Sequence, residues 1–153
     1  MPALAAHRNV KRRQYGNPKI GATLIGTSAI VFEGSLLVAD ATTGLATVAT
    51  DAGAGATNFL GICTGFDYAA TIPSTGVVGD GVIYAKWESN VEVLLVCAAS
   101  VTAADNNKAA YCLDDEGVTD ATTAGPGCGV FRGQEATLAV WVELGAPVLP
   151  AAT

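Results

Sequence analysis

Apolar and polar residues alternate, or β-branched residues gather, in nine short stretches of the chain. These stretches are 23–32, 35–39, 45–50, 59–66, 77–87, 91–97, 109–113, 128–132 and 137–144. A period of two places every second side chain on the same face, as in a strand with one buried face. Gly, Pro, Asn and Asp separate the stretches, as turns require. The pattern predicts a compact all-β domain, sandwich-like or barrel-like, with little helix.

Three segments between these stretches have a more specific interpretation. Residues 101–110 are rich in Ala, and Thr102 is followed three positions later by Asp105, so a short capped helix and a single helical turn both fit. Gly79, Asp80 and Gly81 predict a tight turn. The acidic run 114–116 before Gly117 predicts a solvated turn, because its carboxylates do not alternate as in a calcium loop.

Length and composition suggest one domain with two extensions. The chain has 153 residues, which divide into a basic N-terminal arm (1–20), the β domain (21–145) and a C-terminal tail with two prolines (146–153). Only 14% of the residues are charged, against roughly 25% in an average soluble domain. Such a sparsely charged body, rich in small residues, suggests that much of its surface meets other protein.

Charge is divided unevenly between the arm and the body. The first 19 residues carry five basic and no acidic side chains, and the rest of the chain carries three basic and 14 acidic ones, a net charge of −11. A basic arm on an acidic body is expected to bind something acidic other than its own body. The candidate contact residues are Arg8, Lys11, Arg12, Arg13, Tyr15 and Lys19.

Several interpretations of this arm compete. A solvated tail without a partner is common for charged termini. Nucleic acid is disfavoured, because the cluster is short, only Tyr15 is available for stacking, and the acidic body would repel phosphates. A membrane is disfavoured because neither an amphipathic apolar face nor a lipid anchor is present. An acidic protein surface remains, with Tyr15 and Ile20 as apolar anchors.

Residues suited to catalysis are scarce. The single histidine, His7, lies in the arm, so the body offers no histidine for a hydrolytic triad or an imidazole metal site. We therefore expect no enzymatic activity, no metal and no cofactor. No two of the four cysteines are closer than 15 residues, which favours reduced, buried thiols over a metal or redox motif.

The two tryptophans, Trp87 and Trp141, lie within apolar β stretches. Core packing or a subunit contact is the ordinary role of an aromatic residue there. If the rings were exposed, they could instead form a platform that stacks on sugars or on a partner. The tryptophans therefore support an alternative function, a carbohydrate-binding or fibre-base β module.

Six segments of the chain together resemble a known family. They are 23–38, 59–66 (Phe-Leu-Gly-Ile-Cys-Thr-Gly-Phe), 79–87 (Gly-Asp-Gly-Val-Ile-Tyr-Ala-Lys-Trp), 109–119, 127–133 (Gly-Cys-Gly-Val-Phe-Arg-Gly) and 138–144 (Leu-Ala-Val-Trp-Val-Glu-Leu). This succession of strands and Gly-rich turns over about residues 20–145 resembles the head-decoration, or capsid cement, proteins of tailed bacteriophages. The likeness lies in pattern and composition and not in a diagnostic motif.

The resemblance implies a fold, a role and a location. Such proteins have a compact fold called a β-tulip and assemble as homotrimers, less often as dimers. They bind the outer surface of the phage head between capsomers, where an arm reaches onto the major capsid protein, and they stabilise the expanded shell without catalysis. The implied location is the virion, after synthesis in the cytoplasm of the bacterial host. No apolar run approaches the roughly 20 residues of a membrane helix, and the short apolar stretch before the basic cluster is unlike a secretory signal.

Overall fold

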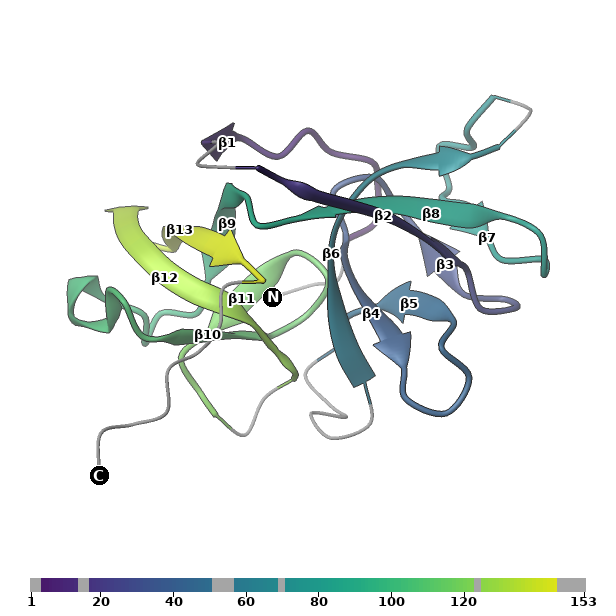
Figure 1. Ribbon diagram of the computed structural model, residues 1–153. Helices are drawn as coiled ribbons and strands as arrows, with labels where there is room; N and C mark the ends of the chain where they lie inside the picture. The colour runs from purple at the N-terminus through teal and green to yellow at the C-terminus, as the bar shows by residue number, and fades with distance from the viewer. Residues whose placement is uncertain (1–3, 14–16, 51–56, 69–70, 123–124, 146–153) are drawn as a thin grey trace.

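The computed structural model describes residues 4–13, 17–50, 57–68, 71–122 and 125–145. Strands make up almost all of its regular structure, and one 3₁₀ turn is its one helical element in this part of the chain (Figure 1). The all-β prediction is therefore confirmed. The predicted C-terminal tail, 146–153, lies outside the described residues.

One half of the molecule is a closed barrel. Its strands follow the order β9-β11-β10-β12-β13, and β13 pairs again with β9, which closes the ring. These strands are β9 (Glu92–Cys97), β10 (Ala109–Cys112), β11 (Gly117–Thr119), β12 (Gly127–Ala136) and β13 (Ala139–Leu144). Closure pairs the backbone groups that an open sheet leaves free at its edges. Strand β11 pairs with Val96 and Cys97, at the end of β9. The start of β9 is therefore left for another strand on the same side.

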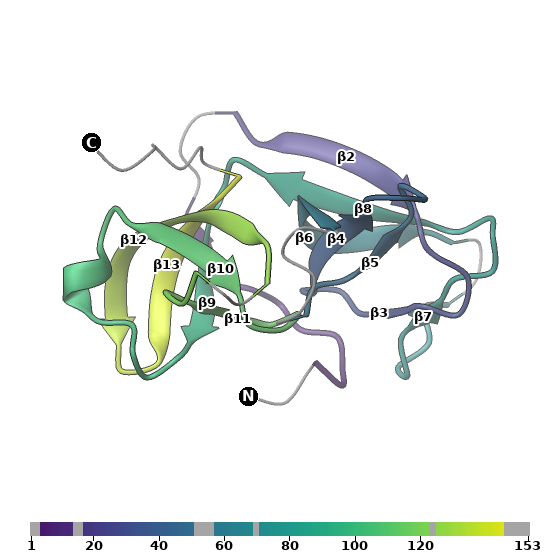
Figure 2. The same ribbon diagram turned by 90° about the horizontal axis from the view of Figure 1, so that it is seen from below.

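The other half is a five-stranded sheet with a small two-stranded sheet beside it. We call the larger one the open sheet, because its outer strands meet at an isolated bridge between Ile25 and Ala46 and not along their length. The larger sheet has the order β2-β8-β6-β4-β5, and the smaller one pairs β3 with β7. Their strands are β2 (Lys19–Leu24), β3 (Ile30–Val31), β4 (Leu36–Asp40), β5 (Ala46–Val48), β6 (Thr57–Asp67), β7 (Val77–Val78) and β8 (Tyr84–Ser89). Figure 2 shows the barrel at one end of the molecule and the open sheet at the other.

The open sheet contributes to two hydrophobic cores because side chains alternate across a strand. Leu36 and Val38 of β4, with Ile62 of β6, pack with the barrel residues. Leu37 and Cys63, on the other face of the same strands, pack with Val31, Val77 and Trp87. This explains the unbroken apolar run 36–38, since β4 is covered on both faces.

Two predicted strands are each broken in two. The stretch 23–32 holds the end of β2 and all of β3, and Ser28 between them has a φ of 69°. The stretch 77–87 holds β7 and most of β8, and the predicted turn between them is confirmed. In this turn Asp80 Oδ1 accepts a hydrogen bond from the Val82 amide at 3.0 Å, and Gly81 has a φ of 92°. A uniform apolar pattern could not show these breaks, because both halves of each stretch are β.

The Ala-rich segment forms a single turn and not a longer helix. The 3₁₀ turn η1 spans Ala103–Asp105. Asp105 Oδ2 accepts a hydrogen bond from the Thr102 amide at 2.8 Å, and Thr102 Oγ1 accepts one from the Ala104 amide at 3.3 Å. The predicted cap is therefore confirmed, with both side chains saturating amides that the turn leaves free.

The acidic run is a turn, but only in part a solvated one. Asp114 Oδ1 accepts hydrogen bonds from the amides of Glu116 and Gly117 at 2.9 and 2.7 Å, as a turn predicts. Asp115, however, is only 2% exposed. The prediction of solvation is wrong at Asp115, because the N-terminal segment covers it. The four cysteines are free and buried, as expected.

Candidate functional site

The structure gathers most of the predicted contact residues at the junction of the barrel and the open sheet. Arg8, Lys11, Arg12 and Arg13 lie on the N-terminal segment that crosses this junction, and Arg12 and Arg13 form strand β1 (Figure 1). Lys19 begins β2 on the open sheet, inside the predicted arm. Tyr15 lies outside the described residues.

The backbone of the N-terminal segment, residues 4–13, is bound to the body at several points. Strand β1 pairs antiparallel with β9, with Arg12 opposite Val93 and Arg13 opposite Glu92. The Leu94 amide donates to the carbonyl of Lys11 at 2.8 Å, and the Arg8 amide donates to the carbonyl of Glu33 at 3.1 Å. Strand β1 thus occupies the part of β9 that β11 leaves free, and the segment completes the barrel wall.

The basic side chains of this segment bind carboxylates of the same chain. Arg12 forms an ion pair with Glu88, Arg13 Nη2 lies 2.7 Å from Glu92 Oε1, and Lys11 Nζ lies 3.6 Å from Glu135 Oε1. The expectation that the arm binds something other than its own body is therefore wrong for these pairs. The attraction between the basic segment and the acidic body is satisfied within one molecule.

Arg8 is held by carbonyl groups. Its Nη2 donates to the carbonyl oxygens of Gly34 and Glu116 at 3.0 and 3.3 Å, and its Nε donates to Gly34 at 3.2 Å. Burial lowers the pKa of Arg8, and the nearby carboxylates of Glu116, Asp115 and Asp114 oppose this effect. The guanidinium therefore links the N-terminal segment to the turn that follows β3 and to the acidic turn.

Trp141 is covered by the same segment. The Arg13 guanidinium carbon lies 3.9 Å from the centroid of the indole ring, and Lys11 Nζ lies 6.0 Å from it. A cation over an indole face is attracted by the electron density of the ring. Trp141 is 7% exposed and Trp87 is 9% exposed. Trp87 also packs in the second core and donates its Nε1 hydrogen to Thr23 Oγ1 at 3.0 Å.

An exposed stacking platform at the tryptophans is therefore wrong. Both rings are buried, in different parts of the molecule, and one of them lies under the N-terminal segment. Trp87 packs in the second core, and Trp141 is covered by Arg13 and Lys11 of the N-terminal segment.

His7 anchors the start of the segment, which its place in the sequence did not indicate. Its Nδ1 accepts a hydrogen bond from the Glu33 amide at 2.9 Å. Its Nε2 lies 2.7 Å from the carbonyl oxygen of Pro73, and since a carbonyl only accepts, the hydrogen must be on Nε2. The ring packs edge-on against Phe32 and Phe66. The two contacts together describe the tautomer that accepts at Nδ1 and donates at Nε2.

Asp115 forms a second anchor. Its Oδ1 accepts a hydrogen bond from the Leu4 amide at 2.8 Å, and its Oδ2 lies 3.5 Å from Ser35 Oγ. Burial raises the pKa of Asp115, and the neighbouring Asp114 carboxylate raises it further, while the Leu4 amide and Arg8 oppose this.

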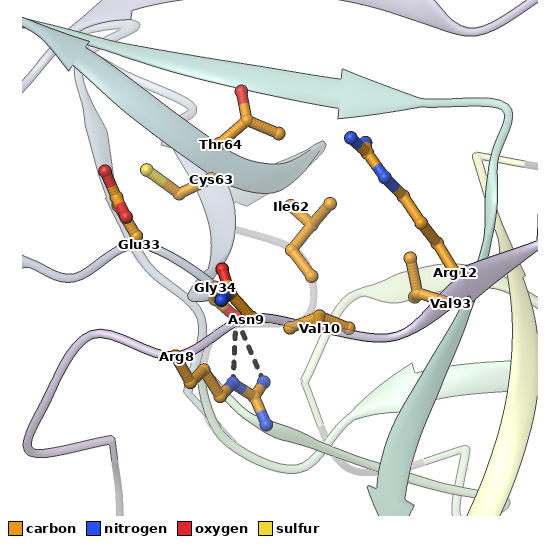
Figure 3. Close-up of a pocket in the computed structure, with 10 residues that line it drawn as sticks. All are labelled: Arg8, Asn9, Val10, Arg12, Glu33, Gly34, Ile62, Cys63, Thr64 and Val93. Carbon is orange, nitrogen blue, oxygen red and sulfur yellow. Dashed lines mark hydrogen bonds between the residues drawn. The ribbon is translucent and has the colours of Figure 1, made fainter.

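A pocket of 270 Å³ lies between the N-terminal segment and the open sheet. The polar side chains that line it are those of Arg8, Asn9, Arg12, Glu33, Cys63 and Thr64 (Figure 3). Burial raises the pKa of the Cys63 thiol to about 12, so the thiol is protonated at neutral pH and is a poor nucleophile. Both arginines are already bound to groups of the chain.

The carboxylates that bind the segment were missed as contact residues. Glu88, Glu92 and Glu135 lie far from the arm in sequence, and nothing in their local pattern marks them. The uneven distribution of charge could have predicted these contacts. Five cations beside a body of net charge −11 can form ion pairs within one chain as well as with a partner.

The described residues, 4–13, 17–50, 57–68, 71–122 and 125–145, lack two further features. In these ranges, no three His, Cys, Asp or Glu side chains lie together as a metal ion would require. The same ranges contain no helix that is long and apolar enough to cross a membrane. Comparison of the whole chain with protein families, curated proteins and solved structures finds no match.

Proposed function

We propose that this protein is a structural cement protein, which binds the major capsid protein on the outer surface of a phage head and assembles with copies of itself. The proposal rests on the resemblance of residues 20–145 to phage decoration proteins and on one surface observation. In this role the protein stabilises the expanded shell and catalyses nothing.

The observation that carries the proposal is the apolar end of the molecule where β3, β7 and the start of β8 lie. Ile30 and Val78 face each other across β3 and β7 and are 49% and 51% exposed. Val82 and Tyr84, just beyond the turn, are 72% and 43% exposed. Hydrogen bonds from Ser28 to Gly79 and from Ile25 to Ile83 hold the loops of this end together. Clustered exposed apolar side chains favour contact with another protein.

The charges around this end favour a particular kind of partner. The charged residues that adjoin its strands in sequence are Glu33 after β3, Asp80 in the turn and Lys86 on β8. A mainly apolar surface with two carboxylates and one ammonium group offers a phosphate backbone little attraction. It suits a protein surface that is apolar with a basic rim.

The N-terminal segment has a different role in this proposal from that of a free arm. Because β1 is paired, the segment presents its cations from a fixed strand. The side chains of Lys11 and Arg12 remain 67% and 50% exposed despite their ion pairs, and Lys19 is exposed. These cations, with Tyr15, are the groups we propose to contact acidic sites on the capsid. Repetition over several joined subunits would strengthen a weak contact.

The test is cosedimentation with expanded, empty heads assembled from the major capsid protein of the phage to which the proposal assigns this chain. Deletion of residues 1–19 is unsuitable, since it would remove β1 and part of the barrel wall. We expect Lys11→Gln with Lys19→Gln to lower occupancy on heads at least severalfold. Lys108→Gln is the matched control, because the Lys108 side chain is 65% exposed and pairs with Asp105 at 3.8 Å.

The outcomes separate two parts of the proposal. If the unaltered protein does not cosediment with the heads, the cement function is wrong. If the double variant decorates heads as fully as the unaltered protein, the role of these cations is wrong and the apolar end becomes the site to substitute, first at Val82→Lys. Loss of occupancy with Lys108→Gln alone would indicate a general charge effect.

A further inference from the structure

Two of the four buried cysteines, Cys112 and Cys128, meet inside the barrel. Cys112 ends β10, and Cys128 lies near the start of β12, which pairs with β10. The two residues are 0% and 1% exposed and belong to the same hydrophobic core. Since they are not neighbours in the sequence, the pairing of β10 with β12 is what brings them together.

A β-bulge places both side chains on the inner face of the barrel wall. The ladder between β10 and β12 shifts between Ala110 and Tyr111, and Cys128 is the extra residue of β12 at this shift. In an unbroken ladder Cys128 would pair with Tyr111 and share its face, which is opposite to the face of Cys112. Because of the bulge, the Cys128 side chain instead lies in the core with Ala110 and Cys112.

The two thiols are in contact. The Cys128 thiol donates to the carbonyl oxygen of Ala110 at 3.5 Å. Hydrogen bonding with the Cys112 thiol, together with burial, raises the pKa of Cys128 well above its usual range. From this contact, rotation of the two side chains is the remaining step towards the roughly 2.05 Å of a disulfide bond.

We propose that Cys112 and Cys128 form a disulfide between β10 and β12 when the protein meets an oxidising environment. The bond closes a loop that holds the acidic turn, with the Asp115 anchor, and strand β11. Strand β11 has three residues and completes the ring through Val96 and Cys97 of β9. A cross-link beside this short seam limits the opening of the barrel.

The oxidant is a small disulfide, such as oxidised glutathione. The thiolate of one cysteine attacks a sulfur of this molecule, breaks its S–S bond and releases one glutathione thiolate. The thiolate of the other cysteine attacks the protein sulfur of the mixed disulfide, forms the Cys112–Cys128 bond and releases the second glutathione thiolate. Two cysteines are oxidised, one glutathione disulfide is reduced, and two protons pass from the cysteines to the glutathione thiolates.

Burial decides when this exchange can occur. In the closed barrel glutathione cannot reach either sulfur, and the raised pKa of Cys128 leaves very little of its thiolate. The exchange therefore takes place while the barrel forms or opens. Closure of the barrel then favours the bond, because it holds the two sulfurs together, and burial protects the bond from reductants.

The other two cysteines are poorer partners. Cys97 and Cys112 both pair with Val118, from opposite sides, so one strand separates them. Two strand spacings amount to about 10 Å, too far for a disulfide without movement of the backbone. Cys63 belongs to the second core, in the open sheet.

The first experiment counts free thiols. The full chain is unfolded with a reductant, refolded in a buffer of reduced and oxidised glutathione, and alkylated with N-ethylmaleimide in denaturant. We expect the mass of the whole chain to show two alkylated cysteines out of four. Peptide mapping without reduction should join the peptide of Cys112 to that of Cys128. Incubation of the folded chain in the same buffer should give the same bond more slowly, because the barrel must open.

Two variants control this count. Cys97→Ala is the matched control, since Cys97 is also 1% exposed and lies in the same core. It should still form the bond and keep one free thiol. Cys112→Ala should keep all three of its thiols free. Circular dichroism of the reduced variants verifies that each of them is folded.

The second experiment tests whether the folded barrel accommodates the bond. Closing a loop of about 15 residues restricts the unfolded chain, so the oxidised protein should melt on the order of 5–10 °C above the reduced one. Cys112→Ala should melt at the same temperature in both buffers. Four free thiols, a bond to Cys63 or Cys97, or a lower melting temperature of the oxidised chain would each overturn the inference. It does not depend on the cement function, since no capsid enters either experiment.

Discussion

Arg13 is bound by two neighbours at once, an indole ring and a buried carboxylate. Its guanidinium lies 3.9 Å from the Trp141 ring centroid and its Nη2 lies 2.7 Å from Glu92. The Glu92 side chain is only 8% exposed, so without the Arg13 side chain little water could reach and hydrate its carboxylate. A planar guanidinium can stack on a ring and bind a carboxylate together, which an ammonium cannot do as well.

We therefore predict that Arg13→Ala lowers the free energy of unfolding by about 2 kcal/mol, since it leaves Glu92 buried and unpaired and uncovers Trp141. Arg13→Lys should lose about half as much. Arg132→Ala is the control, because Arg132 and Glu143 form a pair that is about a third exposed at both ends; its loss should stay below about 1 kcal/mol. Chemical denaturation measures the free energy of unfolding of all three variants. Equal losses in Arg13→Ala and Arg132→Ala would show that the indole ring and the buried carboxylate give Arg13 no extra stabilising effect.

Gly21 is a second constrained position, because a Cβ there would overlap the Trp87 ring. Gly21→Ala should displace the indole from Thr23 and cost about 2 kcal/mol. Gly65, on β6 of the same sheet, has open space where a Cβ would lie. Gly65→Ala should leave stability nearly unchanged, and denaturation midpoints of the two variants compare the sites directly. An unaffected Gly21→Ala would mean that the ring can move without loss.

Asp115 should make stability depend on pH. Burial raises its pKa in the folded state above the ordinary 3.8. Between the two values the folded protein binds more protons than the unfolded chain, so this carboxyl lowers stability as pH rises from 3.8 through the raised pKa. Asp115→Asn does not titrate and can still accept the Leu4 amide.

The stability of Asp115→Asn relative to the unaltered chain should therefore increase across this range and then level off. Denaturation of both proteins at several values from about pH 3 to about pH 7 measures this difference, in which the other titrating groups cancel. Parallel curves would show that Asp115 does not titrate differently in the two states.

At the scale of elements, the N-terminal segment is part of the barrel wall and not a free arm. Strand β1 has two residues, but the segment around it also supplies His7, Arg8 and the Leu4 amide to the body. These contacts reach Glu33, Pro73, Asp115 and Glu116, so one short segment connects distant loops of the open sheet and the barrel.

Deletion of residues 1–13 should therefore destabilise the body by at least about 3 kcal/mol, because it exposes β9 and leaves Glu92 and Asp115 without their partners. Full-length Lys11→Gln is the control, since the exposed Lys11–Glu135 pair contributes little. Thermal and denaturant unfolding measure the difference. A truncated protein with an unchanged midpoint would show that the segment is a dispensable arm.

At the scale of the whole molecule, the barrel and the open sheet share a core. Leu36, Val38 and Ile62 of the open sheet are packed among the barrel residues. The Leu36 amide also donates to the carbonyl of Asp115 at 2.7 Å. Arg12, on β1 beside the barrel, pairs with Glu88 of the open sheet. Neither half can unfold without exposing apolar surface of the other.

We predict one cooperative unfolding transition, and the two tryptophans allow a test. Trp141 reports on the barrel in Trp87→Phe, and Trp87 reports on the open sheet in Trp141→Phe. Within each variant the fluorescence midpoint should coincide with the midpoint by circular dichroism. A displaced fluorescence midpoint in either variant would show that one half unfolds separately.

Local sequence signals were sufficient wherever a structure depends on neighbours in the chain. The strands at 35–39, 59–66 and 91–97, the capped turn at Thr102 and the turn at Asp80 all follow from alternation, side-chain caps and glycine, and the structure confirms them. Strand β11, with three residues, was missed because so short a segment shows no period.

Long-range pairing had to come from the tertiary structure. The sequence by itself determined an all-β chain with a basic start and an acidic body. Only the folded chain shows that Glu88, Glu92 and Glu135 meet these cations, that Asp115 is buried, and that both tryptophans are covered. The physical reason is that the charge or hydrophobicity of a residue indicates which kind of contact stabilises it. Which distant residue provides that contact depends on how the barrel closes.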